Sequence, residues 1–283
     1  MRSIALALLV LAVPRMAAPQ DATPTAPLSL AAHAVPSVTL GLPEQEQFLL
    51  TARVSRVQNV KKGVTGTRRA TLTDGSSTHD VSIQTIDESK TRFESTRRIE
   101  FNFRDYWGYN VAAYRLGRML GLDMVPPSVQ RPFRGSSAAF TWWIDDVVMD
   151  EQQRSKAQAP PPDRTYWNDQ IHVMRVFDEL VANTDRNQGN MLIDKHWKLW
   201  LIDHTRGFRV TAGLQKPQII RRCERSLLER MKALTLDDLK AELGRYLNDG
   251  EMQALLKRRD RLVAHVESLG PSALYDLTRP QPQ

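Results

Sequence analysis

Residues 183–203 read NTDRNQGNMLIDKHWKLWLID, and this stretch says the most about the architecture of the chain. Two apolar segments joined by a polar turn within residues 194–198 predict a β-hairpin. In a hairpin centred there, Asn190 and Asp203 fall at or near facing positions, and facing residues lie about 4.5–5.5 Å apart. Asp185 comes a few residues before the first strand. The pattern therefore predicts that an acid, an amide and a second acid gather at one end of a hairpin.

These three side chains have the chemistry of a phosphoryl-transfer site. Mg²⁺ in such sites is held by one or two protein oxygens together with the phosphates of the substrate. We expect Asn190 and Asp203 to hold Mg²⁺, and Asp185 to orient a nucleophile beside it. An acid and an asparagine at this spacing also arise by chance, and acids often form turns. The order of a long amphipathic helix, the motif, a hairpin and Ile-Asp favours the catalytic interpretation.

The same residues resemble a known superfamily. Asp185-Arg186, then Asn190 and then Asp203 resemble the D-R-x-x-x-N … D pattern of atypical kinases. These include the phosphatidylinositol 3- and 4-kinases, the HipA-like kinases and the secreted kinases of the Golgi lumen. The thirteen positions from Asn190 to Asp203 also resemble the phosphatidylinositol kinase spacing. The resemblance implies that Asp185 is the catalytic acid, Asn190 a metal ligand and Asp203 the equivalent of the DFG aspartate. It departs after Asp203, where the glycine of that motif is lost and the chain continues His204-Thr-Arg-Gly207-Phe208.

The residues around this motif have less specific predicted roles. Arg186 is expected to pair with Asp185 or with a nearby acid, as structural support. His204 is either a partner of the metal-binding acid or a structural histidine, and we favour the second interpretation.

Composition fits a soluble globular protein of 283 residues, with 41% hydrophobic and 25% charged residues. The net charge of +7 suits ATP, acidic glycans or an anionic lipid surface as partners. No recognition motif or interleaving of basic and aromatic residues supports nucleic-acid binding. The basic cluster at residues 257–261 is interpreted as a solvated helix face.

Residues 1–18 form the pattern of a secretory signal peptide. Arg2 precedes the ten-residue apolar run Ile4–Val13, and Met16-Ala17-Ala18 offers a small-residue cleavage site. The run is far shorter than the ~20 residues of a membrane-spanning helix. We therefore predict an exported, periplasmic or secreted protein with no transmembrane helix. Its single cysteine, Cys223, cannot form an intrachain disulfide and is interpreted as a bystander.

The rest of the chain divides into strands first and helices afterwards. Residues 19–44 are predicted to be a flexible tether, residues 152–163 a linker, and residues 278–283 a tail. Strands are predicted within residues 49–86, with a turn at Asp74-Gly75, and over residues 138–144 as a hinge. Helices are predicted over residues 105–120, 165–182, 239–247 and 251–269. This order predicts an α+β, two-lobed protein-kinase-like fold, with a β-rich lobe at 45–143 and a helical lobe at 144–277.

A phosphate-binding loop is predicted before the second strand. Gly63 and Gly66 allow close backbone approach to a nucleotide, and Lys62 lies beside them. A lone G-x-x-G is a weak signal, because it forms a turn without any ligand.

The main departure from a kinase is at Gln84. In the kinases that the chain resembles, this strand ends in a lysine that pairs with a helix glutamate and holds phosphates. Here both positions are neutral, as Gln84 and Asn110. Either Lys62 or Lys90 replaces the missing cation, or the protein binds nucleotide weakly as a pseudokinase or uses the fold for another transfer.

Four further residues are candidates for contact with the nucleotide. Trp142 and Trp143 could flank adenine, although core packing suits at least one of them. Asp145 or Asp146 could accept ribose hydroxyls or could cap the following helix.

The leading functional hypothesis is an exported kinase that uses ATP and Mg²⁺ and transfers the γ-phosphate to a hydroxyl of a protein, lipid or sugar. One alternative is a pseudokinase-like nucleotide-binding or interaction module. Another is a basic glycan- or membrane-surface binder with no nucleotide.

Overall fold

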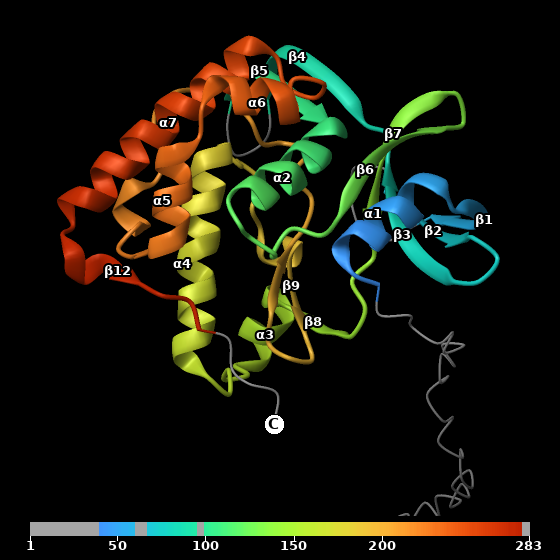
Figure 1. Ribbon diagram of the computed structural model, residues 1–283, viewed down its shortest axis with the longest axis horizontal. Coiled ribbons are helices and arrows are strands. Elements are labelled where there is room, and N and C mark those ends of the chain that lie inside the picture. The colour runs from blue at the N-terminus through green and yellow to red at the C-terminus, as the bar shows by residue number, and fades with distance from the viewer. Residues whose placement is uncertain (1–39, 60–66, 95–98, 279–283) are drawn as a thin grey trace, which may run out of the picture. The chain divides into compact units, whose positions relative to one another are not determined.

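The computed structural model describes residues 40–59, 67–94 and 99–278 (Figure 1). The predicted signal peptide at 1–18 and most of the predicted tether and tail lie outside these ranges, as do Lys62, Gly63 and Gly66. No helix within the described ranges is both long enough and apolar enough to cross a membrane.

An antiparallel five-stranded sheet forms the β-rich lobe. Its strands are β1 (Arg53–Asn59), β2 (Arg68–Thr73), β3 (Thr78–Gln84), β6 (Ser128–Phe133) and β7 (Ser136–Trp142), in the order β1-β2-β3-β7-β6. Alternate residues such as Leu72, Ile83 and Phe140 are fully buried on one face of it. The predicted turn at Asp74-Gly75 is present: Gly75 has φ +99° and Asp74 accepts backbone hydrogen bonds from Ser76 and Ser77.

Helix α1 (Leu42–Thr51) covers this sheet and was not predicted. The tether prediction is wrong for residues 42–44, which form the first turn of the helix. Pro43 suits that turn because its missing N–H would have no partner there. Phe48 and Leu49 are buried in the core of the sheet, and Arg131 Nη1 donates to the carbonyls of Leu49 and Ala52 at 2.8 Å each.

A long hairpin, β4 (Asp87–Glu94) and β5 (Ile99–Tyr106), was also missed. It delivers the chain to α2 (Gly108–Met119). The predicted helix over residues 105–120 is therefore shorter at its start, because β5 continues through Tyr106. Asn102, within β5, has φ +51°, a conformation that asparagine tolerates better than most residues.

The second lobe is mainly helical and, within the described residues, contains two small sheets. Its elements are β8 (Val147–Asp150), α3 (Glu151–Ala157), α4 (Arg164–Val181), β9 (Met191–Asp194), β10 (Leu199–Leu201), β11 (Cys223–Glu224), α5 (Arg225–Ala233), α6 (Leu236–Leu243), α7 (Asp249–Ser268) and β12 (Leu274–Tyr275). The two sheets have the strand orders β10-β9-β8 and β11-β12. The linker prediction is wrong for residues 152–157, which belong to α3. A capping box between Asp150 and Gln153 starts that helix.

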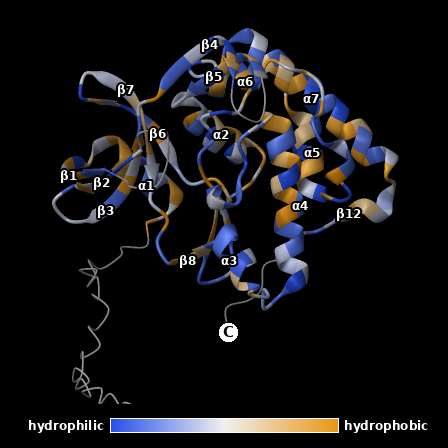
Figure 2. Cartoon of the chain, turned by 180° about the vertical axis from the view of Figure 1, so that it is seen from behind, coloured by the Kyte–Doolittle hydropathy of each residue, from blue (hydrophilic) through white to orange (hydrophobic). Residues whose placement is uncertain are grey.

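The core of the helical lobe forms around α4, which packs against α7. The predicted apolar face of α4 is buried through Trp167, Met174, Phe177 and Val181. Both hydrophobic and hydrophilic residues lie along α7 in Figure 2, as expected of a helix with one buried face. Cys223 is buried in this core, and burial raises the pKa of its thiol to about 12.

The interpretation of residues 257–261 as a solvated face is wrong for Arg258. This side chain is fully buried, where its guanidinium donates to the carbonyls of Leu180 (2.8 Å), Arg209 (2.6 Å) and Thr211 (2.6 Å). Burial lowers the pKa of Arg258 to about 10, so the group remains charged at neutral pH. One guanidinium thus joins α7 to the end of α4 and to the segment after Phe208.

Replacing Arg258 tests this connection. Arg258→Met leaves three buried carbonyls without their donor, and we expect the free energy of unfolding to fall by ~3 kcal/mol. Urea-induced unfolding measures the loss. Arg261→Met is the matched control on the same helix, because Arg261 is exposed and bonds only the Ala212 carbonyl. Equal losses in the two variants would contradict the structural role of Arg258.

Candidate active site

The segment that follows α4 is held in a fixed turn. The helix ends with Ala182 in the left-handed conformation at φ +49°. The backbone N–H of Asn183 returns to the carbonyl of Asp178 (2.9 Å), and the Asn183 side chain accepts from the N–H of Asp185 (3.0 Å). Asp185 is therefore placed by local hydrogen bonds directly after the long helix.

The predicted hairpin is present. Its strands β9 and β10 pair Leu199 with Ile193 and Leu201 with Met191, and the turn lies within residues 194–198. One step further, the N–H of Ile202 donates to the carbonyl of Asn190 at 3.1 Å. Asn190 thus faces Ile202, and Asp203 lies one residue beyond it.

Arg186 ties these parts together. Its guanidinium makes a two-point contact with the Asp178 carboxylate, at 2.9 and 3.1 Å. Its Nη1 atom also donates to the carbonyls of Asn190 (2.9 Å) and Ile202 (2.8 Å). Arg186 therefore joins α4 to the two chain segments that meet at the open end of the hairpin. Arg186 was expected to pair with Asp185 or with a nearby acid. It pairs with the nearby acid Asp178, and the contact fits the expected structural role.

His204 completes this contact. Its Nε2 atom lies 2.9 Å from Arg186 Nη2, and the residue is fully buried. Burial and then the charge of Arg186 hold the pKa of His204 well below its usual range. The neutral ring accepts from the guanidinium, which fits the interpretation of His204 as a structural histidine.

Asp203 is held by a chain of neutral amides. Its Oδ1 atom accepts from Gln84 Nε2 (3.2 Å) and from the Thr205 hydroxyl (3.1 Å). Gln84 Oε1 accepts from Asn110 Nδ2 at 2.6 Å, and Asn110 Oδ1 accepts from the N–H of His204 at 2.8 Å. The two positions that are neutral in the sequence are therefore in direct contact. They connect β3 and α2 to Asp203 without an ion pair.

Asp105 is a site residue that the sequence analysis missed. It lies near the end of β5, beside the backbone hydrogen bond from Tyr106 to Thr205 (2.8 Å). The side chain is buried, and its Oδ1 atom has no hydrogen-bond partner among the described residues. Burial raises the pKa of the Asp105 carboxyl. A hydrogen bond with Thr205 lowers this pKa, whereas the charge of Asp203 raises it further.

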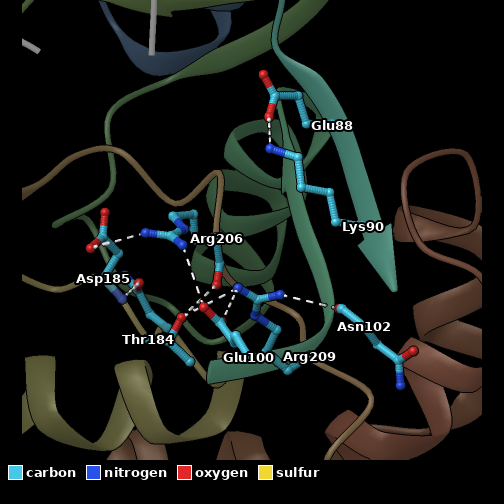
Figure 3. A network of polar contacts seen from close by, with 9 residues as sticks. Glu88, Lys90, Glu100, Asn102, Thr184, Asp185, Arg206 and Arg209 are labelled. Atoms are coloured by element: carbon cyan, nitrogen blue, oxygen red, sulfur yellow. Dashed lines mark hydrogen bonds and ion pairs between the residues drawn. The ribbon is translucent and has the colours of Figure 1, made fainter. Parts of the chain in front are cut away.

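Arg206 is a second residue missed by the sequence analysis. Its Nη1 atom lies 3.6 Å from Asp185 Oδ1, and its Nη2 atom lies 3.4 Å from Glu100 Oε2 (Figure 3). Asp185 keeps 41% of its side chain exposed, so it reaches solvent beside a largely buried cation. The charges of Arg206 and Asp185 also act on the pKa of Asp105, which Arg206 lowers and Asp185 raises. Asp105, Asp185, Asp203 and Arg206 therefore share one electrostatic site.

Lys90, a predicted replacement for the missing strand lysine, lies elsewhere. Its ammonium pairs with Glu88 at 3.3 Å and lies over the ring of Phe93. Within the described residues, no contact joins Lys90 to Gln84 or Asp203. The other candidate, Lys62, lies outside these residues together with Gly63 and Gly66.

The residues near the predicted hinge are engaged in other contacts. Trp142 is buried and stacks on His79 with ring centroids 3.5 Å apart, which is a packing role. Asp145 pairs with His79 at 2.8 Å, and Asp146 pairs with Lys195 at 2.7 Å. The cap of the next helix is Asp150 and not either of these two acids. Contact of these residues with a nucleotide stays a prediction.

Trp200 lies where the two lobes meet. It faces Leu192 across the β9–β10 hairpin and packs against the core of the five-stranded sheet. Its indole N–H donates to Asp194 at 2.9 Å, and the Lys198 ammonium lies 3.6 Å from its ring centroid. Burial lowers the pKa of Lys198 to about 8.

The donor set fits a hard cation held jointly with a substrate. Within the described part of the chain, no group of three or more His, Cys, Asp or Glu side chains is arranged to hold a metal ion. A Mg²⁺ ion in a phosphoryl-transfer site needs only one or two protein carboxylates, because phosphate oxygens supply other ligands. The unpartnered Oδ1 atom of Asp105, beside Asp203, is a vacant acceptor of the kind that such an ion would use.

Comparison with known proteins gives a likeness of fold. No protein-family model matches the sequence, and no curated protein matches it. Among solved structures, the chain is similar to hydra Fam20 with sugar, at a TM-score of 0.63 and 14% identity over 85% of this chain and 93% of that chain. It is also similar to the Golgi casein kinase with Mn/ADP bound, at a TM-score of 0.57 and 11% identity over 82% of this chain and 76% of that chain.

These likenesses confirm the predicted fold class. The chain has an α+β, two-lobed kinase-like fold, similar to the folds of hydra Fam20 and the Golgi casein kinase. The closer resemblance to phosphatidylinositol kinases, the lobe boundaries and the roles of individual residues stay predictions.

Arg186 should be required for the stability of this site. Arg186→Ala leaves a buried carboxylate and two carbonyls without their donor, and we expect it to lower the free energy of unfolding by ~3–5 kcal/mol. Arg69→Ala is the control, because Arg69 pairs with Asp80 at 2.6 Å but in a more exposed setting, where such a pair contributes ~0–1 kcal/mol. Chemical denaturation compares the two variants. Similar losses would argue against the central role of Arg186.

Proposed function

We propose that the protein is an ATP-dependent phosphotransferase that transfers the γ-phosphate to a hydroxyl group. The observation that carries the proposal is the electrostatic site formed by Asp105, Asp185 and Asp203 at the end of the hairpin in a kinase-like fold. Phosphoryl transfer asks a protein mainly for positioning and for neutralisation of charge. Three carboxylates close together repel a further anion, such as a phosphate, unless a cation binds between them. The site therefore suits a metal–nucleotide complex.

Each residue then has a distinct role. Asp203, Asn190 and Asp105 would hold Mg²⁺, which when bound neutralises charge on the phosphates. Asp185 orients the acceptor hydroxyl. The acceptor oxygen forms a bond to the γ-phosphorus while the bond from that phosphorus to the β,γ-bridging oxygen breaks. ADP leaves, and the hydroxyl proton passes to Asp185.

The amide pair Gln84–Asn110 positions Asp203 in place of the expected ion pair. It supplies hydrogen bonds but no charge for the phosphates. Arg206 supplies positive charge on the other side of the site, where it lies 3.6 Å from Asp185. In this proposal Arg206 limits the repulsion among the carboxylates, and Asp185 accepts the proton of the acceptor hydroxyl.

The similar structures and the signal-peptide pattern indicate the acceptors to test and the location of the protein. One similar structure is described with sugar and another is a casein kinase, so a sugar and a protein hydroxyl are the first acceptors to test. A lipid acceptor fits the basic net charge. Export of the protein is supported by the signal-peptide pattern of residues 1–18 and by the secretory setting of the similar kinases.

A second candidate function is a nucleotide-binding module that does not transfer phosphate. The neutral Gln84–Asn110 pair favours it, because both halves of the ion pair found in the resembling kinases are absent. The two functions predict the same binding of Mg-ATP but different turnover.

Substitution of the two central acids distinguishes these functions. We expect Asp185→Ala to lower turnover by at least ~100-fold and to spare Mg-ATP binding, because it removes proton acceptance and orientation. Asp203→Ala should weaken Mg-ATP binding itself. ATP consumption over a panel of sugar, peptide and lipid acceptors measures the first effect, and thermal shift with Mg²⁺ and ATP the second. Asp276→Ala, at an exposed acid, is the control.

The outcomes separate the candidates. Wild-type turnover in both variants would refute the assigned roles. A thermal shift without turnover on any acceptor supports the non-transferring module. The absence of a shift with wild-type protein would overturn both nucleotide-binding functions.

Asp105 provides an independent test of the metal site. Asp105→Asn removes a buried carboxylate that is repelled by Asp203, so we expect a higher melting temperature in EDTA. The same variant should raise the Mg²⁺ concentration for half-maximal thermal stabilisation by ATP by ~tenfold, because one charged ligand is lost. A variant that is less stable without metal and unchanged in its Mg²⁺ requirement would show that Asp105 is only a structural residue.

A further inference from the structure

A cavity of about 380 Å³ lies between the β4–β5 hairpin, residues 208–210 and the start of α7. Three cations contribute to its lining, Lys90, Arg104 and Arg209, together with three aromatic residues whose side chains are buried, Phe103, Tyr109 and Phe208. Asp185, Asn190 and Asp203 do not line it. In Figure 3, Lys90 and Asn102 lie to one side and Asp185 to the other, with Arg206, Glu100 and Arg209 between them. The cavity is therefore separate from the candidate active site.

The accessible charge in this cavity is positive. The side chains of Lys90 and Arg104 are 49% and 34% exposed. The acid in the lining, Glu251, is only 4% exposed. Its carboxylate oxygens already accept from the Tyr109 hydroxyl (2.5 Å) and from the N–H of Asn248 (2.8 Å). A ligand that enters the cavity meets cations and not an available carboxylate.

Arg104 is the cation with the most unused hydrogen-bonding capacity. Its two ion pairs, to Glu251 and to Asp87, are both 3.7 Å long, beyond hydrogen-bond distance. Its guanidinium stacks over the ring of Tyr106 at 4.3 Å, and its Nε atom is buried without a hydrogen-bond partner among the described residues. A guanidinium carries five N–H donors, and a buried donor without an acceptor is costly. The geometry calls for an acceptor-rich group at Arg104.

The other two cations are engaged differently. Arg209 donates to Glu100 at 2.6 Å, so its charge is committed to the wall of the cavity. Lys90 pairs with the exposed Glu88 at 3.3 Å, and an exposed pair of this kind is weak and exchangeable. Arg104 and Lys90 are therefore the pair that can turn to a ligand.

We propose that this cavity binds a small phosphate monoester. The phosphate is held by the fork of Arg104 and by the Lys90 ammonium. Arginine matches the oxygen geometry of phosphate with two parallel hydrogen bonds, and lysine adds a point charge. Side chains of Ser89, Thr91 and Asn102 in the same lining can bond to hydroxyls of the organic part. Nothing in this site depends on phosphoryl transfer at Asp185.

Calorimetric titration of the full chain without nucleotide tests the proposal. The probes are inorganic phosphate, glucose 6-phosphate and glucose. Both phosphates should bind and glucose should not. Arg104→Gln should raise the dissociation constant about tenfold or more, because it removes a charged hydrogen-bonding partner. Lys90→Gln should raise it by a smaller factor. Arg115→Gln is the matched control, because Arg115 also pairs with an acid (Glu242, 3.3 Å) and stacks on a tyrosine, but away from the cavity.

Each outcome bears on the proposal. Tighter binding of glucose 6-phosphate than of inorganic phosphate assigns the site to a monoester, and equal binding assigns the same chemistry to free phosphate. The proposal is overturned when neither phosphate binds, or when binding is unchanged in both Arg104→Gln and Lys90→Gln. It is also overturned when Asp203→Ala abolishes phosphate binding and Arg104→Gln retains it, which would place the phosphate in the candidate active site.

The test is independent of the proposed function. Arg104→Gln should retain the thermal shift with Mg²⁺ and ATP, so loss of phosphate binding and loss of nucleotide binding are read separately. Lys90 is exposed, and its substitution gives a result even when Arg104→Gln does not fold.

Discussion

The guanidinium of Arg186 bonds at the same time to a carboxylate of α4, to the carbonyl of Asn190 and to the carbonyl of Ile202. These carbonyls belong to facing residues at the open end of the hairpin, and Ile202 is the residue before Asp203. This shared donor connects the loop after α4 to the hairpin. A lysine could not replace this arrangement, because the contact needs several donors held in one plane. The positions of Asp185, Asn190 and Asp203 therefore depend on a residue that itself touches no substrate in the proposed reaction.

The amide chain through Gln84 and Asn110 solves a second positioning problem. A buried lysine–glutamate pair must recover the cost of removing two charges from water. Two neutral amides avoid that cost and keep the hydrogen-bonded path from β3 through α2 to the backbone of His204. The consequence is electrostatic: the charges of Asp203 and Asp185 both act on Asp105, and Arg206 acts on Asp105 and pairs with Asp185. The amide pair keeps the hydrogen-bonded geometry but carries no charge. The sequence is therefore compatible both with phosphate transfer and with nucleotide binding alone.

Much of the hairpin and of α4 could be predicted because their signals are local. Alternating apolar residues, a polar turn and a 3.6-residue period lie within short windows. The neutral pair was also foreseeable, because the resemblance aligned Gln84 and Asn110 with a known contact. Asp105 and Arg206 could not be found in this way. They meet through pairing of β5 with the segment after Asp203, which is a contact between residues about a hundred positions apart in the chain. The burial of Arg258 could not be predicted for the same reason, because its three acceptors come from distant backbone segments.

Strand β5 explains how one element serves two separate surfaces. Neighbouring residues of a strand point to opposite faces. Arg104 contributes to the cavity beside the β4–β5 hairpin, while Asp105, next to it, joins the electrostatic site of Asp185 and Asp203. The left-handed conformation at Asn102 disturbs the regular alternation just before this pair, and the register of the hairpin skips that position. In a regular strand, the direction of each side chain follows from that of its neighbour. After this position the alternation resumes: Phe103 stacks on Phe93 and lies beneath Arg206, and Arg104 contributes to the cavity.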